Sequence, residues 1–300
     1  MSFLMTDRAQ HLRGLLQTLL GVLILTPDAL ILRLIEANTA VLIFWRGFFQ
    51  FLAVALFYAC VYRRAAPAIV RSIGGVGVII ACLYAGSNIL FITSIRLTSV
   101  ANTLVIVAVS PMIASVLTWM FLKEKVPART WVAAVAGFAG IAYIFLSEVS
   151  GGSMLGNILA FAAACTLGAN FVIIRYAKAS SMVPAVGLTG LIIALVVGPV
   201  AGSLTVSFSD LLWLLLLGGV ITTLSFALIT LGPRYLPAPE VNLIMLVETV
   251  LGPLWVWMCL GETVSKATWV GGTILVGALV LHSIASLQNG RTEPVLSDSA

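Results

Sequence analysis

The stretch WMFLKEKVPARTWV, residues 119–132, occurs a second time in this chain as WMCLGETVSKATWV, residues 257–270. The two copies align without a gap and share eight of their fourteen residues. Lys123, Lys125 and Arg129 of the first copy are replaced by uncharged residues in the second. A duplication that keeps its tryptophans and its glutamate but loses these charges indicates that the two copies lie in different electrostatic surroundings.

The composition restricts the class of protein. Hydrophobic residues make up 61% of the 300 residues and charged residues only 9%, whereas about a quarter of the residues in a soluble protein are charged. Such a chain cannot cover a surface that faces water, so we predict an integral membrane protein in a lipid bilayer. The net charge of +5 resides in short basic clusters between apolar runs. These clusters indicate membrane topology, and nucleic acid is not an expected partner.

Residues suited to metal binding or catalysis are few. Four cysteines lie inside apolar runs without metal-ligand spacing, namely Cys60, Cys82, Cys165 and Cys259. Their positions predict buried thiols, without a disulfide or a metal site. The two histidines, His11 and His282, lie near opposite ends of the chain, and motifs of metalloproteases, serine hydrolases and nucleotide-binding loops are absent from the sequence. We therefore expect no catalytic residues, no metal and no cofactor, and an intramembrane enzyme is a distant alternative.

The apolar runs have the length of membrane-crossing helices. A bilayer core about 30 Å thick needs about 20 helical residues, and windows of that size predict ten helices in this chain. They cover residues 13–32, 39–62, 73–95, 99–121, 130–147, 154–174, 182–205, 210–232, 237–260 and 267–287. We predict an all-α membrane protein made of two five-helix repeats, 13–147 and 154–287, followed by a polar cytoplasmic tail, 288–300.

The basic residues predict the orientation of the helices. With the N-terminus in the cytoplasm, twelve Lys and Arg residues fall on the cytoplasmic side, three fall outside and Arg46 lies within a span. Cytoplasmic loops carry the excess of Lys and Arg, so both termini are predicted to be cytoplasmic. Five spans, an odd number, separate the two copies of the quoted stretch, so the repeats are inverted. Inverted repeats are typical of secondary transporters.

Further pairs of residues support the duplication. Ser87 matches Ser225, and Arg96 matches Arg234, at the same offset along the chain as the two copies of the quoted stretch. A slightly larger offset, near the start of each half, gives the matched pairs Gly14 with Gly156, Asp28 with Asn170 and Arg33 with Arg175. The duplication therefore extends beyond the quoted stretch into most of each half.

The chain resembles the drug/metabolite transporter superfamily, in particular proteins with two EamA domains. The resemblance covers about residues 13–287 and is carried by SPMIASVLTWMFLKE, from Ser110 to Glu124, and ETVLGPLWVWMCLGE, from Glu248 to Glu262. The second motif departs from the family pattern at Thr249, where a proline often follows the glutamate. The resemblance implies a ten-helix fold and efflux of small metabolites across the bacterial inner membrane.

Two charged residues lie near the outer ends of the first two spans. Asp28 is about five residues from the end of the first span, and Arg46 about seven from the end of the second, so their depths differ by only about 3 Å. A charge inside the bilayer costs roughly 2.5–3.5 kcal/mol on insertion scales, which favours a salt bridge between them. The pair is either purely structural, or part of an outer gate or of a substrate-carboxylate site using Arg46.

A third charged residue, Glu248, lies near the middle of the ninth span. Loss of water disfavours the charged form of a carboxyl group, so Glu248 suits coupling to protons or binding of a substrate amine. The alternative is a protonated side chain that bonds a neighbouring helix. Uncharged polar residues inside the spans are further candidates, either as cavity lining or as bridges between helices: Tyr84, Asn88, Asn102, Asn170 and Asn242. Tyr84 and Asn88 share a helix face.

Together these features predict a secondary transporter of the bacterial inner membrane that works by alternating access. We expect it to export a small polar metabolite, such as an amino acid, a compound derived from one or a drug-like molecule, with protons as a candidate coupling ion. An importer of the same fold is the closest alternative. The expected oligomeric state is a monomer or a weak homodimer.

Overall fold

The computed structural model describes residues 2–65, 73–123, 128–148, 154–176, 183–231, 235 and 238–290. The helices of the first half are α1 (Ser2–Leu25), α2 (Asp28–Leu34), α3 (Thr39–Tyr62), η1 (Arg63–Ala65), α5 (Gly74–Leu97), α6 (Val100–Val107), α7 (Ser110–Leu122) and α8 (Ala128–Glu148). Those of the second half are α9 (Met154–Tyr176), α10 (Val183–Val197), η2 (Gly198–Val200), α11 (Phe208–Leu214), η3 (Leu215–Thr222), α12 (Thr223–Leu231), α13 (Ala238–Leu260) and α14 (Lys266–Gly290).

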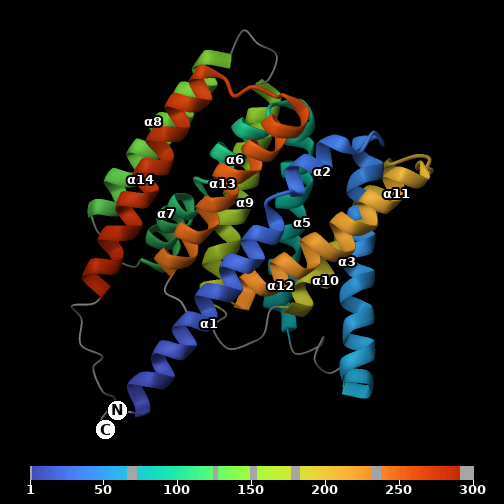
Figure 1. Cartoon of the computed structure of the whole chain (residues 1–300), viewed down its shortest axis with the longest axis horizontal. Helices are drawn as coiled ribbons and strands as arrows, with labels where there is room; N and C mark the ends of the chain where they lie inside the picture. Colours follow the sequence, from blue (N-terminus) through green and yellow to red (C-terminus); the bar gives the residue numbers. More distant parts are fainter. Residues whose placement is uncertain are drawn as a thin grey trace.

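These helices confirm the predicted all-α membrane fold with ten crossings. Seven stretches in the described part of the chain are long and apolar enough to cross a bilayer. Three shorter apolar helices complete the set, Pro184–Val200, Ile244–Leu260 and Lys266–Leu281. Figure 1 shows that α1 begins and α14 ends on the same side of the bundle, and that the connection from α13 to α14 lies on the opposite side. Residues 291–300 of the predicted tail lie outside the described residues.

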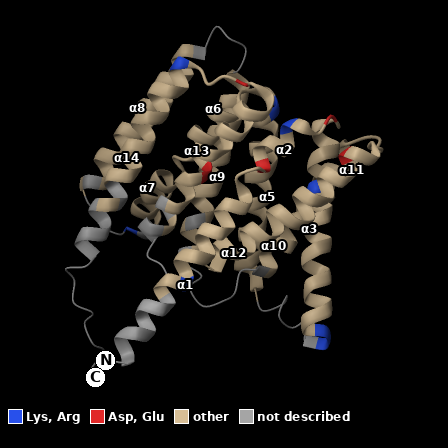
Figure 2. Cartoon of the chain, viewed as in Figure 1, with Lys and Arg blue, Asp and Glu red and all other residues tan. Residues whose placement is uncertain are grey.

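The bundle carries apolar side chains on its surface and polar side chains inside. Phe121, Leu146 and Val200 are each more than 70% exposed, whereas Asp28 and Arg46 are almost fully buried. Figure 2 shows only scattered charged residues on the helices. This distribution suits a bilayer, where the surface faces lipid.

The prediction of buried thiols was wrong, because none of the four cysteines is fully buried. Cys60, Cys82 and Cys259 are exposed, and Cys165 is partly exposed. The outer faces of these helices meet lipid, so the helices are apolar on all sides. An apolar run in the sequence therefore does not show which of its residues point into the bundle.

The first and fourth crossings are each interrupted, which the window analysis missed. Pro27 separates α1 from α2, because proline lacks the N–H group that would continue the helix. The fourth crossing breaks at Ala108 and Val109, and α7 restarts with Pro111 in its first turn, where proline is tolerated. The seventh crossing ends at Val200 rather than at residue 205.

The helices of the two halves contact one another in matching pairs. Each helix of one half has a counterpart in the other half, five crossings away along the chain. The contact of α5 with α9 becomes the contact of α12 with α1 when both helices are replaced by their counterparts, and both contacts are present. In the same way α7 packs on α9 and α13 on α1, while η3 packs on α3 and α5 on α10. The contacts of α3 with α10 and of α8 with α14 map onto themselves. The arrangement therefore has an approximate two-fold relation between the halves.

Close glycine contacts give the relative direction of α3 and α10. A methyl group added to Gly47 would collide with the carbonyl oxygen of Gly190, and one added to Gly190 would collide with that of Gly47. Further along α3, Val54 packs against Gly187, which precedes Gly190. The two helices are therefore antiparallel, which is the relation expected between matching helices of inverted repeats.

Candidate functional site

The predicted pair of charges forms inside the bundle. Nη2 of Arg46 donates to Oδ1 of Asp28 at 2.7 Å, and the two side chains are only 4% and 3% exposed. Nη1 of Arg46 donates to Oδ1 of Asn88 at 2.9 Å, and Thr222 on η3 lies 3.5 Å from the same Asp28 oxygen. These four residues, which we call the central cluster, join α2, α3 and α5 of the first half to η3 of the second.

The break between α1 and α2 places Asp28 beside Arg46. Because α1 stops at Leu25, the chain turns through Thr26 and Pro27 and starts α2 with Asp28. The Thr26 hydroxyl donates to the carbonyl oxygen of Leu23 and accepts from Nε1 of Trp255 on α13. The turn is therefore fixed to the second half, and Asp28 is held next to Arg46 at the first residue of a new helix.

A close backbone contact positions Arg46. A methyl group added to Gly218 on η3 would lie 3.0 Å from the carbonyl carbon of Arg46 and closer still to its oxygen. η3 is a π-helical segment, a wider helix that occurs frequently at functional sites. Only glycine lets this segment approach α3 closely enough for Thr222 to reach Asp28.

We expect Gly218→Ala to destabilise the protein, because the added methyl group forces η3 away from Arg46. Overpacking of this kind typically costs about 1–3 kcal/mol. The measurement is the thermal unfolding temperature of the purified protein in detergent. Gly219→Ala is the matched control, since a methyl group there meets only Cδ1 of Leu215 at 3.4 Å and Cβ of Phe49 at 4.0 Å. Equal unfolding temperatures for the two variants would contradict the tight contact.

Tyr84 and Asn88 lie on one face of α5, as predicted. Nδ2 of Asn88 donates to the carbonyl oxygen of Tyr84 at 2.9 Å, and this fixes the amide with its oxygen toward Arg46. The Tyr84 ring packs edge-on against Phe226 of α12, with 5.8 Å between ring centroids. Asn88 therefore belongs to the central cluster, and Tyr84 adjoins it.

Glu248 lies on α13 and is partly exposed. It interacts electrostatically with both Asp28 and Arg46. In the part of the chain that the structure describes, its carboxylate has no hydrogen bond and no ion pair. Because Arg46 already donates to Asp28 and Asn88, the carboxyl group of Glu248 has no direct ionic partner among the described residues.

Asn170 lies apart from these contacts. Its side chain is fully buried on α9, and neither its amide oxygen nor its nitrogen has a hydrogen-bond partner among the described residues. In the duplication Asn170 holds the place of Asp28. The first half therefore has a carboxylate at this place, and the second half has a neutral amide.

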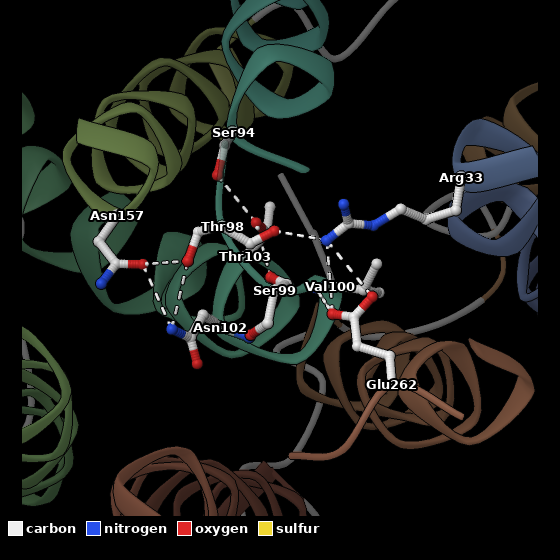
Figure 3. Close-up of polar contacts among 9 residues, drawn as sticks. All are labelled: Arg33, Ser94, Thr98, Ser99, Val100, Asn102, Thr103, Asn157 and Glu262. Carbon is white, nitrogen blue, oxygen red and sulfur yellow. Dashed lines mark hydrogen bonds and ion pairs between the residues drawn. The ribbon is translucent and has the colours of Figure 1, made fainter. Parts of the chain in front are cut away.

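Asn102 belongs to a different group of residues, shown in Figure 3. Its amide nitrogen lies 3.4 Å from the hydroxyl of Thr98 and 3.5 Å from Oδ1 of Asn157, and its oxygen accepts from Thr268. It thus bridges helices α5, α6, α9 and α14 rather than joining the central cluster. Asn242 is part of α13, but its side chain lies outside the described residues.

Two polar residues were missed by the sequence analysis, Thr222 in the central cluster and Gln50 beside it. Gln50, one turn after Arg46 on α3, is 3% exposed and donates to the carbonyl oxygen of Val186 at 2.8 Å. Thr222 was missed because a threonine in an apolar helix is common. Gln50 could have been found, since a glutamine in the middle of an apolar span is costly unless it is bonded. The described residues contain no group of three His, Cys, Asp or Glu side chains that could hold a metal ion.

Comparisons with known proteins agree with this architecture. The EamA-like transporter family matches residues 12–146 and again residues 154–284. The chain is 24% identical over 208 residues to the Uncharacterized transporter YwfM of Bacillus subtilis (strain 168), an alignment that covers 65% of this chain and 69% of that protein. A solved crystal structure with 19% sequence identity aligns over 91% of this chain and 97% of its own chain. The TM-score of 0.65 shows that the two share the fold. The two family matches together span most of the sequence, and the protein belongs to the EamA-like transporter family.

Proposed function

We propose that this transporter is a secondary exporter of small polar metabolites that carry an amine, such as amino acids or compounds derived from them. The proposal rests on the uncompensated carboxylate of Glu248 beside the central cluster. Arg46 is engaged by Asp28 and Asn88, so the charge left to attract a ligand is negative. A protonated amine is the chemical group that matches it.

Protons are the proposed coupling ion. A carboxyl group inside the bundle can bind either a proton or a cationic ligand, but not both together. Glu248 would take up a proton when the site opens to the outside, and exchange it for substrate when the site opens to the cytoplasm. Asp28 and Arg46 would stay paired through the cycle and hold α2 and α3 in register. Asn88 and Tyr84 would line the substrate path.

The two five-helix units, 13–147 and 154–287, would move against each other in an alternating-access cycle. Their inverted orientation is supported by the antiparallel packing of α3 on α10. The proposed location is the bacterial inner membrane with both termini in the cytoplasm, because the Lys and Arg residues gather on that side.

Counterflow in proteoliposomes tests the substrate class. Vesicles loaded with an unlabelled compound are diluted into the same labelled compound, and uptake is followed for a set of amino acids, amines and carboxylates. We expect counterflow for compounds that carry an amine and none for simple carboxylates. Counterflow of carboxylates alone would contradict the role of Glu248 and would favour a substrate site at Arg46.

A further inference from the structure

The amide of Asn170 on α9 is a buried polar group without a hydrogen bond. Its side chain is 0% exposed, and neither Oδ1 nor Nδ2 has a partner in the parts of the chain that the structure describes. The comparable amide of Asn102, 1% exposed, accepts from Thr268. Buried polar side chains in folded proteins are nearly always bonded, and each exception calls for an explanation such as a ligand or a catalytic role.

The face of α9 that carries Asn170 is turned toward α5. Gly156, Ala163 and Asn170 are seven residues apart, which places them on one side of a helix. A methyl group added to Gly156 would lie 3.0 Å from the carbonyl carbon of Leu97 at the end of α5. The carbonyl oxygen of Ala163 accepts from the Ser87 hydroxyl of α5 at 3.2 Å. Asn170 continues this face, so its amide lies at the contact between α5 of the first half and α9 of the second.

The approximate two-fold relation gives each charged residue of the site an uncharged counterpart. The offsets are those of the duplication, and the mutual contact of Gly47 with Gly190 aligns α3 with α10. Asp28, Arg46 and Glu248 are matched, in this order, by Asn170, Thr189 and Ser110, and Thr222 is matched by Tyr84. These counterparts each carry an amide or a hydroxyl group, and we call them the neutral cluster: Tyr84, Ser110, Asn170 and Thr189.

Ser110 lies beside the part of α9 that carries Asn170. A methyl group added to Gly168, two residues before Asn170, would lie 2.9 Å from the carbonyl oxygen of Ser110. Ser110 is 4% exposed and is the first residue of α7, directly after the break in the fourth crossing. The break therefore places a buried residue with a hydroxyl group against α9, as the break between α1 and α2 places Asp28 in the central cluster.

Tyr84 and Thr189 connect the neutral cluster to the central cluster through α5. The Thr189 hydroxyl on α10 is 2.9 Å from the carbonyl oxygen of Ala185 and 3.4 Å from that of Ala81, which lies one turn before Tyr84 on α5. The carbonyl oxygen of Tyr84 accepts from Asn88, a member of the central cluster. The neutral cluster and the central cluster therefore adjoin each other.

The unpaired amide indicates which chemical group fits the neutral cluster. Asn170 presents an acceptor, Oδ1, next to a donor, Nδ2. A primary carboxamide carries the complementary donor and acceptor and satisfies both atoms at once. A carboxylate only accepts hydrogen bonds, so it would leave Oδ1 without a partner.

We propose that the neutral cluster is a second ligand subsite, in which Asn170 binds a carboxamide group of the substrate. This subsite rests on the proposed function, in which Glu248 binds the amine of the same substrate. Together the two subsites narrow the substrate class to amines that carry a carboxamide, such as amides of amino acids. Because Asn170 is fully buried between the two halves, the subsite is closed in this structure and opens as the halves move in the proposed cycle.

The variant Asn170→Leu separates a binding role from a structural one. Leucine needs no hydrogen bond, and no described bond of Asn170 is broken, so the unfolding temperature in detergent should rise by about 2–4 °C. Asn102→Leu is the matched control, because it removes a buried amide that is bonded, and it should lower the unfolding temperature. A lower unfolding temperature for Asn170→Leu would reveal a structural partner of Asn170 and overturn the proposal.

Ligand-induced shifts of the unfolding temperature measure the subsite directly. The purified protein is titrated with β-alaninamide and 4-aminobutanamide, and with the acids of the same length, β-alanine and 4-aminobutanoate. The dependence on ligand concentration gives an apparent Kd for each compound. We expect at least one amide to bind about tenfold more tightly than its acid, the effect of one or two additional hydrogen bonds. In Asn170→Leu this difference should fall to about twofold or less, since leucine has neither a donor nor an acceptor.

Loss of the amide preference in Asn170→Leu, with binding of the amines retained, supports the proposal. Equal binding of amides and acids to the wild-type protein, or an amide preference that persists in Asn170→Leu, would overturn it and leave the amine site at Glu248 intact. Failure of all four compounds to shift the unfolding temperature would overturn both the amine site and the subsite. If Asn170→Leu folds poorly, Asn170→Ala provides the same comparison of amide with acid.

Discussion

Arg46→Gln is expected to unfold a large share of the protein and to abolish counterflow. The substitution leaves Asp28 charged, buried and without its 2.7 Å partner. Breaking a buried ion pair by removing one partner typically costs about 3–5 kcal/mol, a large part of the stability of a folded protein. The measurements are thermal unfolding in detergent and counterflow in proteoliposomes.

Asp28→Asn and the double variant Asp28→Asn with Arg46→Gln complete a double-mutant cycle. Asp28→Asn should destabilise the protein similarly, whereas the double variant should be more stable than either single variant, because no charge is left unpaired. The exchange Asp28→Arg with Arg46→Asp should restore folding in part. A double variant that folds without transporting would assign Arg46 a further role in contacting substrate. Strictly additive losses would argue against energetic coupling of the pair.

Glu248→Gln should retain the fold and lose the proposed proton-driven export. Glutamine keeps the size of the side chain, and no described ion pair of Glu248 is broken by the change. A neutral amide binds neither a proton nor an amine strongly, so net export driven by a pH gradient should fall to the background of empty vesicles. Residual substrate exchange, where it persists, should be independent of pH.

Two measurements decide this prediction. Substrate export is followed in proteoliposomes with and without an imposed pH gradient, and counterflow is measured at several pH values. Asp210→Asn is the matched control, because Asp210 lies near the start of α11, away from the central cluster, and bonds the backbone of Glu36; it should keep the pH response. Wild-type rate and wild-type pH dependence in Glu248→Gln would make Glu248 a structural residue, and Asp28 would become the next candidate for coupling.

The sequence predicted those features that depend on position along a single span. Ten apolar runs indicated the fold class, and similar depths of Asp28 and Arg46 predicted a salt bridge that the structure contains at 2.7 Å. Features that depend on which helices meet were harder to predict. The sequence left Asn102 open as cavity lining or as a bridge between helices, and its contacts lie in a cluster separate from the Asp28–Arg46 pair. Hydropathy gives the depth of a residue, not the direction in which its side chain points.

The helix breaks illustrate the same limit. Pro27 is visible in the sequence, yet the averaged hydropathy of the first span stays high across it, so a window analysis treats α1 and α2 as one helix. The interruption at Ala108 and Val109 involves two apolar residues and carries no local signal beyond Pro111 that follows. The close approach of Gly218 to Arg46 joins residues far apart in the chain and could come only from the packed structure.

The neutral Asn170 at the place that Asp28 holds in the other half has a consequence for kinetics. In a transporter with two identical inverted halves, a two-fold rotation would convert the inward-facing state into the outward-facing state, and the two states would have equal energy. Here one half carries a buried charge pair and the other a buried amide without a partner among the described residues. In the proposed alternating-access cycle the two states therefore differ in free energy, and we expect different half-saturation concentrations for substrate presented at the two faces of the protein.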